Sequence, residues 1–491
     1  MTDLDYLKMS KGEKLVHNAG KWIASLPKKL LNSICAIAMF FVNLVKKFIA
    51  EIKDIVMTFV HGDWKTRVSF FIMGFGSFAR GQWLRGLLFL LFQTVFNMYI
   101  LFFGGAYLAK FATLGTIATT KVNRKTVYGD NSFMILLYGI LTIFFIIAFI
   151  YTWRANVRQN KISQEILKSG KKLKYAKDDI ASLADSQFHK TLLALPTLGI
   201  FTFTVLPIIF MILVAFTNYD ATHQPPGKLF TWVGFDNFKT LFSSGSANYG
   251  DAFGQVLLWT LIWAFFATFL NYFLGMLVAI MINKKGIKLK KMWRTILVMT
   301  IAIPQFVSLL YVSKLFAADG LINSLLLKWG WIKEALPFWT KPSWARVTVI
   351  AVNIWIGIPY LMLIATGILM NIPADLYESA RIDGANAVQT YGKITLPYML
   401  FVTGPYLLTS FIGNINNFNV IYLLTQGKPD TLGNAAGATD LLITWLYSLT
   451  VDNSNFKIAA CIGIIVFVVC AIINLVVYNL IPSVKNEEDF Q

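Results

Sequence analysis

Amide, hydroxyl and phenol side chains recur at helical spacing within two long apolar segments of this sequence. Their positions advance in steps of three, four and seven residues, which places each set on one face of a helix. The first set is Asn353, Ile356, Gly357 and Tyr360. The second set is Ser410, Gly413, Asn414 and Asn417, continued by Ile421. Asparagine amides donate and accept hydrogen bonds, which suits a ligand rich in hydroxyl groups, so the two faces predict the walls of a sugar-binding cavity.

Polar side chains inside an apolar helix have a second explanation. They can hydrogen-bond to a neighbouring helix, and each such contact stabilises helix association by about 0.6–2 kcal/mol. A single asparagine is better explained in this way. A stripe of three polar groups with a glycine favours a cavity wall, because unpaired polar groups at membrane depth are costly unless they face water or a ligand.

Residue patterns for catalysis and for ATP binding are missing from the sequence. It has no GxxxxGK[ST] loop, no nucleophile elbow and no HExxH pair. Its four histidines lie outside the apolar segments, and no two of them have metal-ligand spacing. Its three cysteines include no CxxC pair. We therefore expect a protein that is not an enzyme and that holds no cofactor or metal of its own.

The segments that carry the polar faces are long enough to cross a membrane. Hydrophobic residues make up 56% of the chain and charged residues only 14%, whereas soluble domains have about 25% charged residues. A membrane-spanning helix needs about 20 apolar residues. Eight such runs predict an all-α, polytopic membrane helix bundle, with spans near 83–108, 132–153, 191–216, 254–282, 294–317, 345–370, 395–424 and 457–482.

The net charge of +19 arises from Lys and Arg residues that flank these runs. This placement indicates contact with lipid headgroups and argues against nucleic-acid binding. Basic clusters follow the second and fourth runs, at 154–177 and 284–294, and basic loops stay in the cytoplasm. With eight spans, both termini are then cytoplasmic and the protein is a multi-pass protein of a plasma membrane. The loop 217–253 lies outside, where its turn residues and aromatics predict a compact cap.

The expected division of the chain follows from these spans. The stretch 33–44 is apolar but short, and it is either an amphipathic helix on the inner leaflet or a ninth span. The expected segments are an interfacial N-terminal segment (1–75), spans one and two with their basic loop (76–180), span three with the outer loop (181–253), a permease core (254–482) and a cytoplasmic tail (483–491).

A helix, a break and a second helix are predicted for the cytoplasmic loop 371–397. Pro373 suits a first helical turn, and Gly384 permits the positive φ that ends a helix. Two interpretations fit this pattern equally. The segment either docks a soluble motor domain or rests on the inner leaflet.

Resemblance to a known family decides between them. The loop resembles the EAA loop of ABC-importer permeases, with Ser379 where the family has alanine, and then Ile394-x-Leu396-Pro397. The resemblance implies a type I ABC-importer permease fold whose coupling helices insert into an ATP-binding subunit. The positions that carry it are Glu378, Ser379, Ala380, Asp383, Gly384 and Ala385.

Further segments are similar to the larger permease subunit of bacterial maltose/maltodextrin-type importers. They are Leu195 to Pro207, Phe216 to Tyr219, 129–139, and Phe411 to Asp430. The similarity implies that the two polar faces line a sugar site. It also implies four kinds of partner: a second permease subunit, two ATP-binding subunits that bind ATP and Mg²⁺, an extracellular sugar-binding protein and an oligosaccharide.

The exact sugar stays open, because related permeases carry lactose and galacto- or arabino-oligosaccharides. Gly413 departs from the enterobacterial pattern, in which an aromatic residue occupies the matching place, and this predicts a wider cavity and a longer or differently shaped oligosaccharide. Two other function classes are disfavoured. An ion-coupled transporter needs ionisable residues at mid-span, and a membrane enzyme needs a catalytic constellation, and the sequence offers neither.

Overall fold

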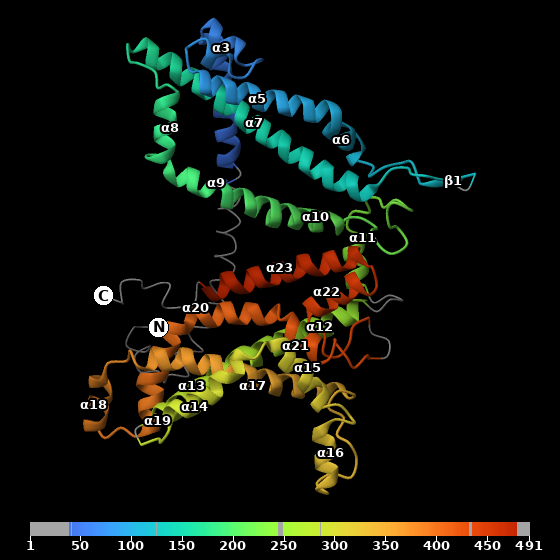
Figure 1. The fold of residues 1–491 in the computed structure, drawn as a ribbon, viewed down its shortest axis with the longest axis vertical. Coiled ribbons are helices and arrows are strands. Elements are labelled where there is room, and N and C mark those ends of the chain that lie inside the picture. The colour runs from blue at the N-terminus through green and yellow to red at the C-terminus, as the bar shows by residue number, and fades with distance from the viewer. Residues whose placement is uncertain are drawn as a thin grey trace, which may run out of the picture. The chain divides into compact units, whose positions relative to one another are not determined.

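The computed structural model describes residues 39–40, 42–123, 125–243, 249–284, 286–431 and 435–478. These residues are almost entirely helical, which confirms the expected all-α class (Figure 1). One antiparallel hairpin pairs β1 (Thr120–Val122) with β2 (Lys125–Val127). Contacts divide the chain into two units, Met1–Ala109 with Tyr138–Phe201 and Lys110–Leu137 with Thr202–Gln491.

Short helices and three long apolar helices make up the N-terminal part of the chain. Residues 42–61 are helical, and the predicted amphipathic stretch 33–44 falls largely outside the described residues. The remaining elements are α3 (Trp64–Val68), α4 (Phe75–Phe78), α5 (Trp83–Tyr99), the π-helical turn η1 (Ile100–Gly104), α6 (Gly105–Phe111), α7 (Ser132–Lys168), α8 (Ala176–Ala184), α9 (Phe188–Ile200), the π-helical turn η2 (Phe201–Val205) and α10 (Leu206–Val214).

A buried arginine joins the short helices to α7 within the first unit. The side chain of Arg80 is 1% exposed and pairs with Asp63, the N-cap of α3, at 2.6 Å. It also donates to Thr66 Oγ1 at 2.7 Å and to Asn160 Oδ1 of α7 at 2.6 Å. A buried charge needs such partners, because an unpaired one is strongly destabilising. The polar end of α7 is therefore packed by the segment 63–82.

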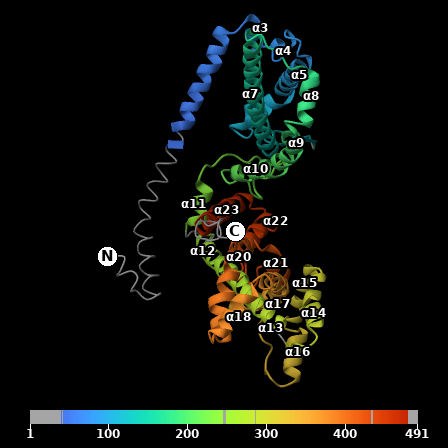
Figure 2. The same cartoon turned by 90° about the vertical axis from the view of Figure 1, so that its left-hand side faces the viewer.

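The second unit holds the elements of the expected permease core. They are α11 (Asp236–Phe242), α12 (Tyr249–Phe265), η3 (Phe266–Leu270), α13 (Asn271–Asn283), α14 (Lys290–Ala302), α15 (Gln305–Leu315), α16 (Leu321–Lys328), α17 (Pro342–Leu369), α18 (Ala374–Ile382), α19 (Ala387–Thr390), η4 (Tyr391–Thr395), α20 (Leu396–Ile415), α21 (Phe418–Leu424), α22 (Leu442–Val451) and α23 (Phe456–Tyr478). Within this unit α18 and α19 lie at one end, and α16 and α22 lie at the other (Figures 1 and 2).

Seven helices of the described residues are long and apolar enough to cross a membrane, and an eighth span is formed if a bent pair is counted as one. Six of the eight predicted runs correspond to single continuous helices. The predicted span 294–317 is a bent pair of helices, because α14 and α15 meet at a bend of 92°. The break falls at Pro304, which has no N–H to continue the helical hydrogen bonds.

The prediction for 395–424 as one helix is wrong, because α20 ends at Ile415 and a separate helix, α21, follows. Asn417 lies between them and caps α21 by accepting a hydrogen bond from the Val420 N–H. Asparagine side chains compete for backbone groups in this way, which favours helix ends over helix interiors.

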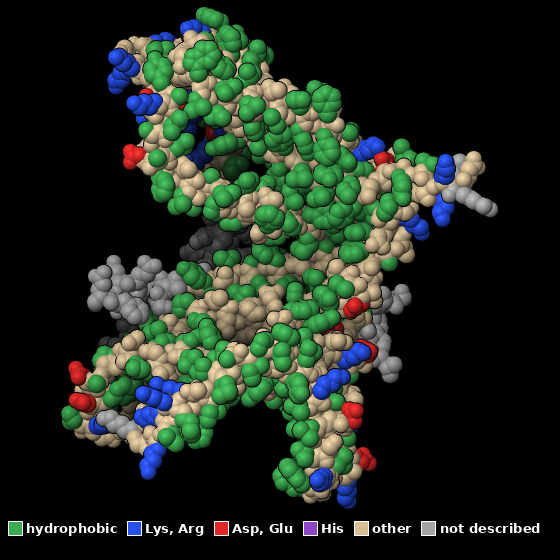
Figure 3. Space-filling model, in the orientation of Figure 1, with side chains coloured by type: hydrophobic (Ala, Val, Ile, Leu, Met, Phe, Trp, Pro, Cys, Tyr) green, Lys and Arg blue, Asp and Glu red, His purple; other side chains and the backbone are tan. Residues whose placement is uncertain are grey.

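Apolar side chains cover much of the visible surface of the helices, as expected for contact with lipid (Figure 3). The most extensive helix packing in the second unit joins α13 to α17. An added Cβ at Gly275 would lie 2.6 Å from Leu361, and one at Gly357 would lie 2.4 Å from the Asn271 amide. Glycines at such positions let helix backbones approach closely in membranes. The contact fixes α17, which carries the first predicted wall.

Candidate functional site

The predicted helix–break–helix at 371–397 is present in the structure. Helix α18 ends at Ile382 with Asp383 as its C-cap, and Gly384 follows with φ +73°. The Ala385 N–H donates to the Ala380 carbonyl at 2.9 Å, and the Gly384 N–H donates to the Arg381 carbonyl at 3.1 Å. These two bonds form a Schellman motif, which satisfies the last carbonyl groups of the helix.

The second helix of the segment has its own start signal. Asn386 caps α19 by accepting from the Gln389 N–H, and the Gln389 side chain accepts from the Asn386 N–H in return. Pro373 is the N-cap of α18, one position before the first turn that the sequence predicted. Tyr377 also bonds Thr395 of η4 at 3.1 Å, which holds α18 against the start of the next span.

Apolar side chains project from this segment into the open. Ile382 is 86% exposed and Val388 is 79% exposed. Glu378, Ser379, Asp383 and Gly384 are exposed as well, whereas Ala380 and Ala385 are half-buried. A stiff helical segment with capped ends and an uncovered apolar surface is suited to insertion into a cleft of another protein.

The first predicted wall lies on α17 and is only partly open. Asn353 is buried, and Ile356 packs against the core formed with α12 and α21. Gly357 faces the Asn271 amide of α13. Tyr360 differs from these three residues because its side chain is 53% exposed.

The second predicted wall is divided by the end of α20. Ser410, Gly413 and Asn414 lie in α20, and Asn417 lies beyond it. Nothing lies within 4 Å of a Cβ added at Gly413, so this position faces open space. The Asn417 amide still donates to Asn414 Oδ1 at 3.3 Å, which keeps the two side chains together although they are not on one helix.

Residues of the fourth span join the two walls, and the analysis of residue spacing missed them. Thr268 accepts from the Asn414 amide at 2.9 Å, and Trp263 Nε1 donates to the Asn414 carbonyl at 3.1 Å. Asn271 donates toward the Asn353 carbonyl at 3.5 Å. Polar residues inside the predicted run 254–282 were the available signal, since such residues need a partner at membrane depth.

A direct link between the walls runs through Tyr406, which also escaped the sequence analysis. It lies one turn before Ser410 on α20, interacts with the Ser410 side chain and lies near Tyr360 of α17. Tyr406 therefore connects the wall on α20, which carries Ser410, with Tyr360 of α17.

The predicted compact cap at 217–253 is confirmed for the described part of that loop. Phe230 is fully buried, and a bridge pairs Thr217 with Trp232. Asp220 pairs with Lys457 of α23 at 2.6 Å and with His223 at 2.9 Å. Burial raises the pKa of Asp220, but the hydrogen bonds from Lys457, Thr222 and His223 outweigh it and hold the pKa well below the usual range.

A second carboxylate of the second unit, that of Asp440, is buried without a paired Lys or Arg among the described residues. Asp440, in the loop before α22, accepts from the Gly437 N–H at 2.8 Å and from the Thr444 hydroxyl at 2.8 Å. Among the described residues no Lys or Arg lies within ion-pair distance of it. Burial raises its pKa to about 6.

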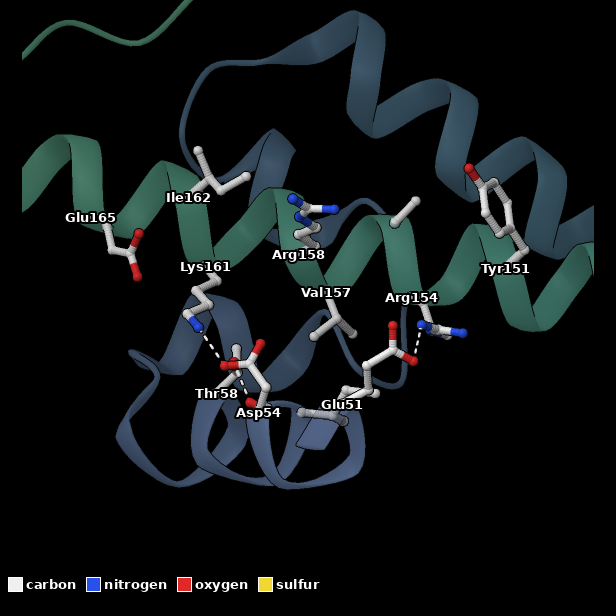
Figure 4. A pocket seen from close by; sticks show the side chains of 12 residues that line it. Glu51, Asp54, Thr58, Tyr151, Arg154, Val157, Arg158, Lys161, Ile162 and Glu165 are labelled. Carbon is white, nitrogen blue, oxygen red and sulfur yellow. Dashed lines mark hydrogen bonds and ion pairs between the residues drawn. The ribbon is translucent and has the colours of Figure 1, made fainter. Parts of the chain in front are cut away.

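A hollow in the first unit is not lined by any predicted sugar residue. A groove of about 580 Å³ separates residues 51–58 from α7. Figure 4 shows Glu51 paired with Arg154, and Asp54 paired with Lys161 at 2.5 Å. Because the opposite charges are matched, this groove offers no unbalanced site for an ion.

Comparison with protein families gives one match over the C-terminal part of the chain. The sequence model described as "Binding-protein-dependent transport system inner membrane component" matches residues 271–486. This range contains the segment 371–397 and all eight predicted sugar residues.

Three curated relatives show how far the similarity extends. The galactooligosaccharides transport system permease protein GanP of Bacillus subtilis is 35% identical over 425 residues, which cover 85% of this chain and 97% of the relative. The maltodextrin transport system permease protein MdxF of Bacillus subtilis is 34% identical over 428 residues, 85% of this chain and 95% of the relative. The maltose/maltodextrin transport system permease protein MalF of Escherichia coli K12 is 34% identical over 267 residues, 52% of this chain and 51% of the relative.

A solved structure has a similar fold. It is a bacterial alginate ABC transporter in complex with an alginate pentasaccharide-bound periplasmic protein. The aligned chains are 24% identical with a TM-score of 0.52, covering 63% of this chain and 98% of the other. At this identity the similarity supports the fold alone.

Proposed function

The chain belongs to the family of binding-protein-dependent ABC-importer permeases, and from this premise we propose that it carries maltodextrin-type oligosaccharides across the membrane by alternating access. It is the permease of an oligosaccharide importer, a multi-pass inner-membrane protein and not itself an enzyme. ATP binding belongs to a partner ATPase.

The observation that carries this function is the segment from α18 to α19. Its two helices are capped on both sides of Gly384, and it leaves Ile382 and Val388 uncovered. It lies at the same end of the second unit as the basic connection between α13 and α14 (Figure 1). Basic loops favour the cytoplasm, so this end faces the ATPase and both termini are cytoplasmic.

The surface shared by α17 and α20 supports the sugar path. Tyr360 of α17 offers an exposed ring for stacking, and Ser410 of α20 adds a hydroxyl next to Tyr406, which interacts with both residues. The open space at Gly413 gives room for a substrate. A second permease subunit completes the cavity around this surface, two ATPase subunits drive it, and an extracellular binding protein delivers the sugar.

A galacto-oligosaccharide is the second candidate substrate. The relative that transports galactooligosaccharides and the relative that transports maltodextrin are about equally similar to this chain, at 35% and 34% identity. Both sugars present hydroxyls and apolar ring faces, so the residues of the two walls suit either one.

ATPase activity of the reconstituted complex separates these possibilities. The complex contains the chain, a second permease, two ATPase subunits and the binding protein loaded with maltotriose or with a galactotriose. Stimulation by maltotriose supports the maltodextrin assignment, and stimulation by the galactoside alone replaces it. A chain that assembles with no ATPase subunit would overturn the coupling function of the segment 371–397.

A further inference from the structure

An open groove lies at the end of the second unit opposite α18, between α15 and the C-terminal end of α21. Its volume is about 790 Å³, within the range of about 300–1,000 Å³ that is usual for ligand sites. Apolar side chains line it, among them Leu310, Leu423 and the buried Leu424. The predicted sugar residues do not line it.

The base of the groove is fixed by the core. Leu424 is 4% exposed and belongs to the cluster built from α12, α15, α17 and α21. The Ser313 hydroxyl donates to the Leu424 carbonyl at 2.7 Å, and Trp339 Nε1 donates to the Ser313 carbonyl at 2.9 Å. The groove is therefore a stable feature of the packed helices.

Three polar side chains with different functions form the rim. Tyr311 is 72% exposed and presents a ring with a hydroxyl. Lys314 is exposed, and no carboxylate of the described residues lies within ion-pair distance of it. Gln426 is exposed and adds an amide that both donates and accepts. A stacking ring, an amide and an ammonium group above an apolar base suit the hydroxyls and ring faces of a sugar.

Gln426, whose amide lies at the rim of the groove, has a strained backbone conformation. Gln426 has φ +54°, a left-handed conformation that is unfavourable for a residue other than glycine. Its N–H donates to the Ile421 carbonyl at 3.2 Å and so ends α21. Glycine is the usual residue at this position of a helix end. A glutamine here keeps an amide at the rim of the groove at the expense of local stability.

The groove continues the predicted sugar path. Helix α21 begins next to Asn417, which contacts Asn414, and it ends next to Gln426. Seven helical residues at about 1.5 Å each span about 10 Å, which corresponds to roughly two sugar units. With the orientation proposed above, the groove lies on the outer side of Asn414 and Asn417.

We propose that this groove is an outer subsite for the oligosaccharide, occupied by the distal sugar units of a long substrate on its way to the surface formed by α17 and α20. This inference rests on the proposed function. It implies that the groove matters for longer chains and is dispensable for a disaccharide, because the two places lie roughly two sugar units apart and a disaccharide held at the surface formed by α17 and α20 has no unit left for the groove.

The test measures stimulation of the reconstituted complex by binding protein loaded with maltose or with maltohexaose. Gln426→Gly removes the amide and relieves the backbone strain, so misfolding cannot explain a loss of activity. Tyr311→Ala removes the ring. We expect each change to lower the stimulation by maltohexaose about five-fold, the size of one lost contact, and to leave the stimulation by maltose unchanged. Tyr151→Ala is the matched control, because Tyr151 is 74% exposed and belongs to the first unit.

The outcomes separate this inference from the proposed function. If no sugar stimulates the wild-type complex, the sugar-importer function itself fails. If the wild type responds and both variants lower the response to maltose and maltohexaose equally, the groove contacts the binding protein instead, and the inference is overturned. Loss of co-purification with the second permease would identify a subunit interface and would overturn it too, as would a wild type that responds to maltose alone.

Discussion

Replacing Gly384 with valine should weaken coupling to the ATPase without disturbing the rest of the fold. Gly384 has φ +73°, and nothing lies within 4 Å of a Cβ added there. The substitution therefore creates no clash. Its effect comes from the backbone, because a β-branched residue strongly disfavours the left-handed conformation that connects α18 to α19.

The magnitude follows from that conformational penalty. A residue other than glycine pays about 1–2 kcal/mol in the left-handed region. The docked segment must pay this penalty to keep the bonds from Gly384 to Arg381 and from Ala385 to Ala380, whereas an undocked segment can relax. Docking of the ATPase should then weaken by up to about 5–30-fold, since every 1.4 kcal/mol is a factor of ten.

The assay compares sugar uptake with ATP hydrolysis in proteoliposomes, and the expected result is a lower ratio of uptake to hydrolysis. Gly392→Val is the matched control, because Gly392 lies in η4 of the same segment, also has open space around it and has no positive φ. Gly384→Asn should fall between wild type and valine, because asparagine tolerates the left-handed region better. Equal effects of valine at both glycines, or normal coupling by Gly384→Val, would refute the backbone argument.

Two further predictions concern the sugar surface and a buried acid. Tyr360→Ala should lower sugar-stimulated ATPase activity at unchanged thermal stability, whereas Asn414→Ala should lower both, because it removes a bond to Thr268 worth about 0.6–2 kcal/mol. Asp440 has a pKa of about 6 in the folded protein, compared with an ordinary value of 3.8. Its negative charge therefore lowers the free energy of unfolding above pH 6. This destabilisation disappears as the carboxylate is protonated between pH 6 and about pH 4. Relative to Asp440→Asn, the wild type should therefore gain thermal stability over that window.

Each of these two predictions has an outcome that would contradict it. A Tyr360→Ala complex that melts early or fails to assemble would assign Tyr360 to helix packing. Melting curves of the wild type and Asp440→Asn that stay parallel between pH 7 and pH 4 would mean that the carboxylate is solvated in solution.

The sequence predicted the helix, break and helix at 371–397 well because their signals are local. A glycine after an amphipathic helix and a proline before it fix the ends of α18 within one residue. The spans were predicted from hydropathy, which depends on a long window and so tolerates local irregularities. Both features need no knowledge of distant contacts.

The break at Pro304 could not be predicted from local sequence signals. Pro359 lies in the interior of α17, which continues through it, while Pro304 separates α14 from α15 at 92°. A proline removes one backbone donor in either case. Whether the helix then bends or breaks depends on how neighbouring helices pack against it, and this information is spread over several spans. The position of Asn417 was equally hard to predict, because an asparagine amide can hydrogen-bond inside a helix, cap a helix end or bind a ligand.

Contacts across spans also decide what each polar residue on the two predicted walls does. The Asn414 side-chain amide donates to the Thr268 hydroxyl, and the Asn414 backbone carbonyl accepts from Trp263 Nε1. Asn414 therefore joins two helices and also lies beside the open space at Gly413. A substitution there changes two properties at once. Tyr360 has no such double function, because its ring is half exposed and its neighbour is Tyr406. Residue spacing left open whether these residues form a cavity wall or interhelical hydrogen bonds, and the structure gives a different answer for each residue. A substitution at Tyr360 can therefore test sugar binding without a change in helix packing.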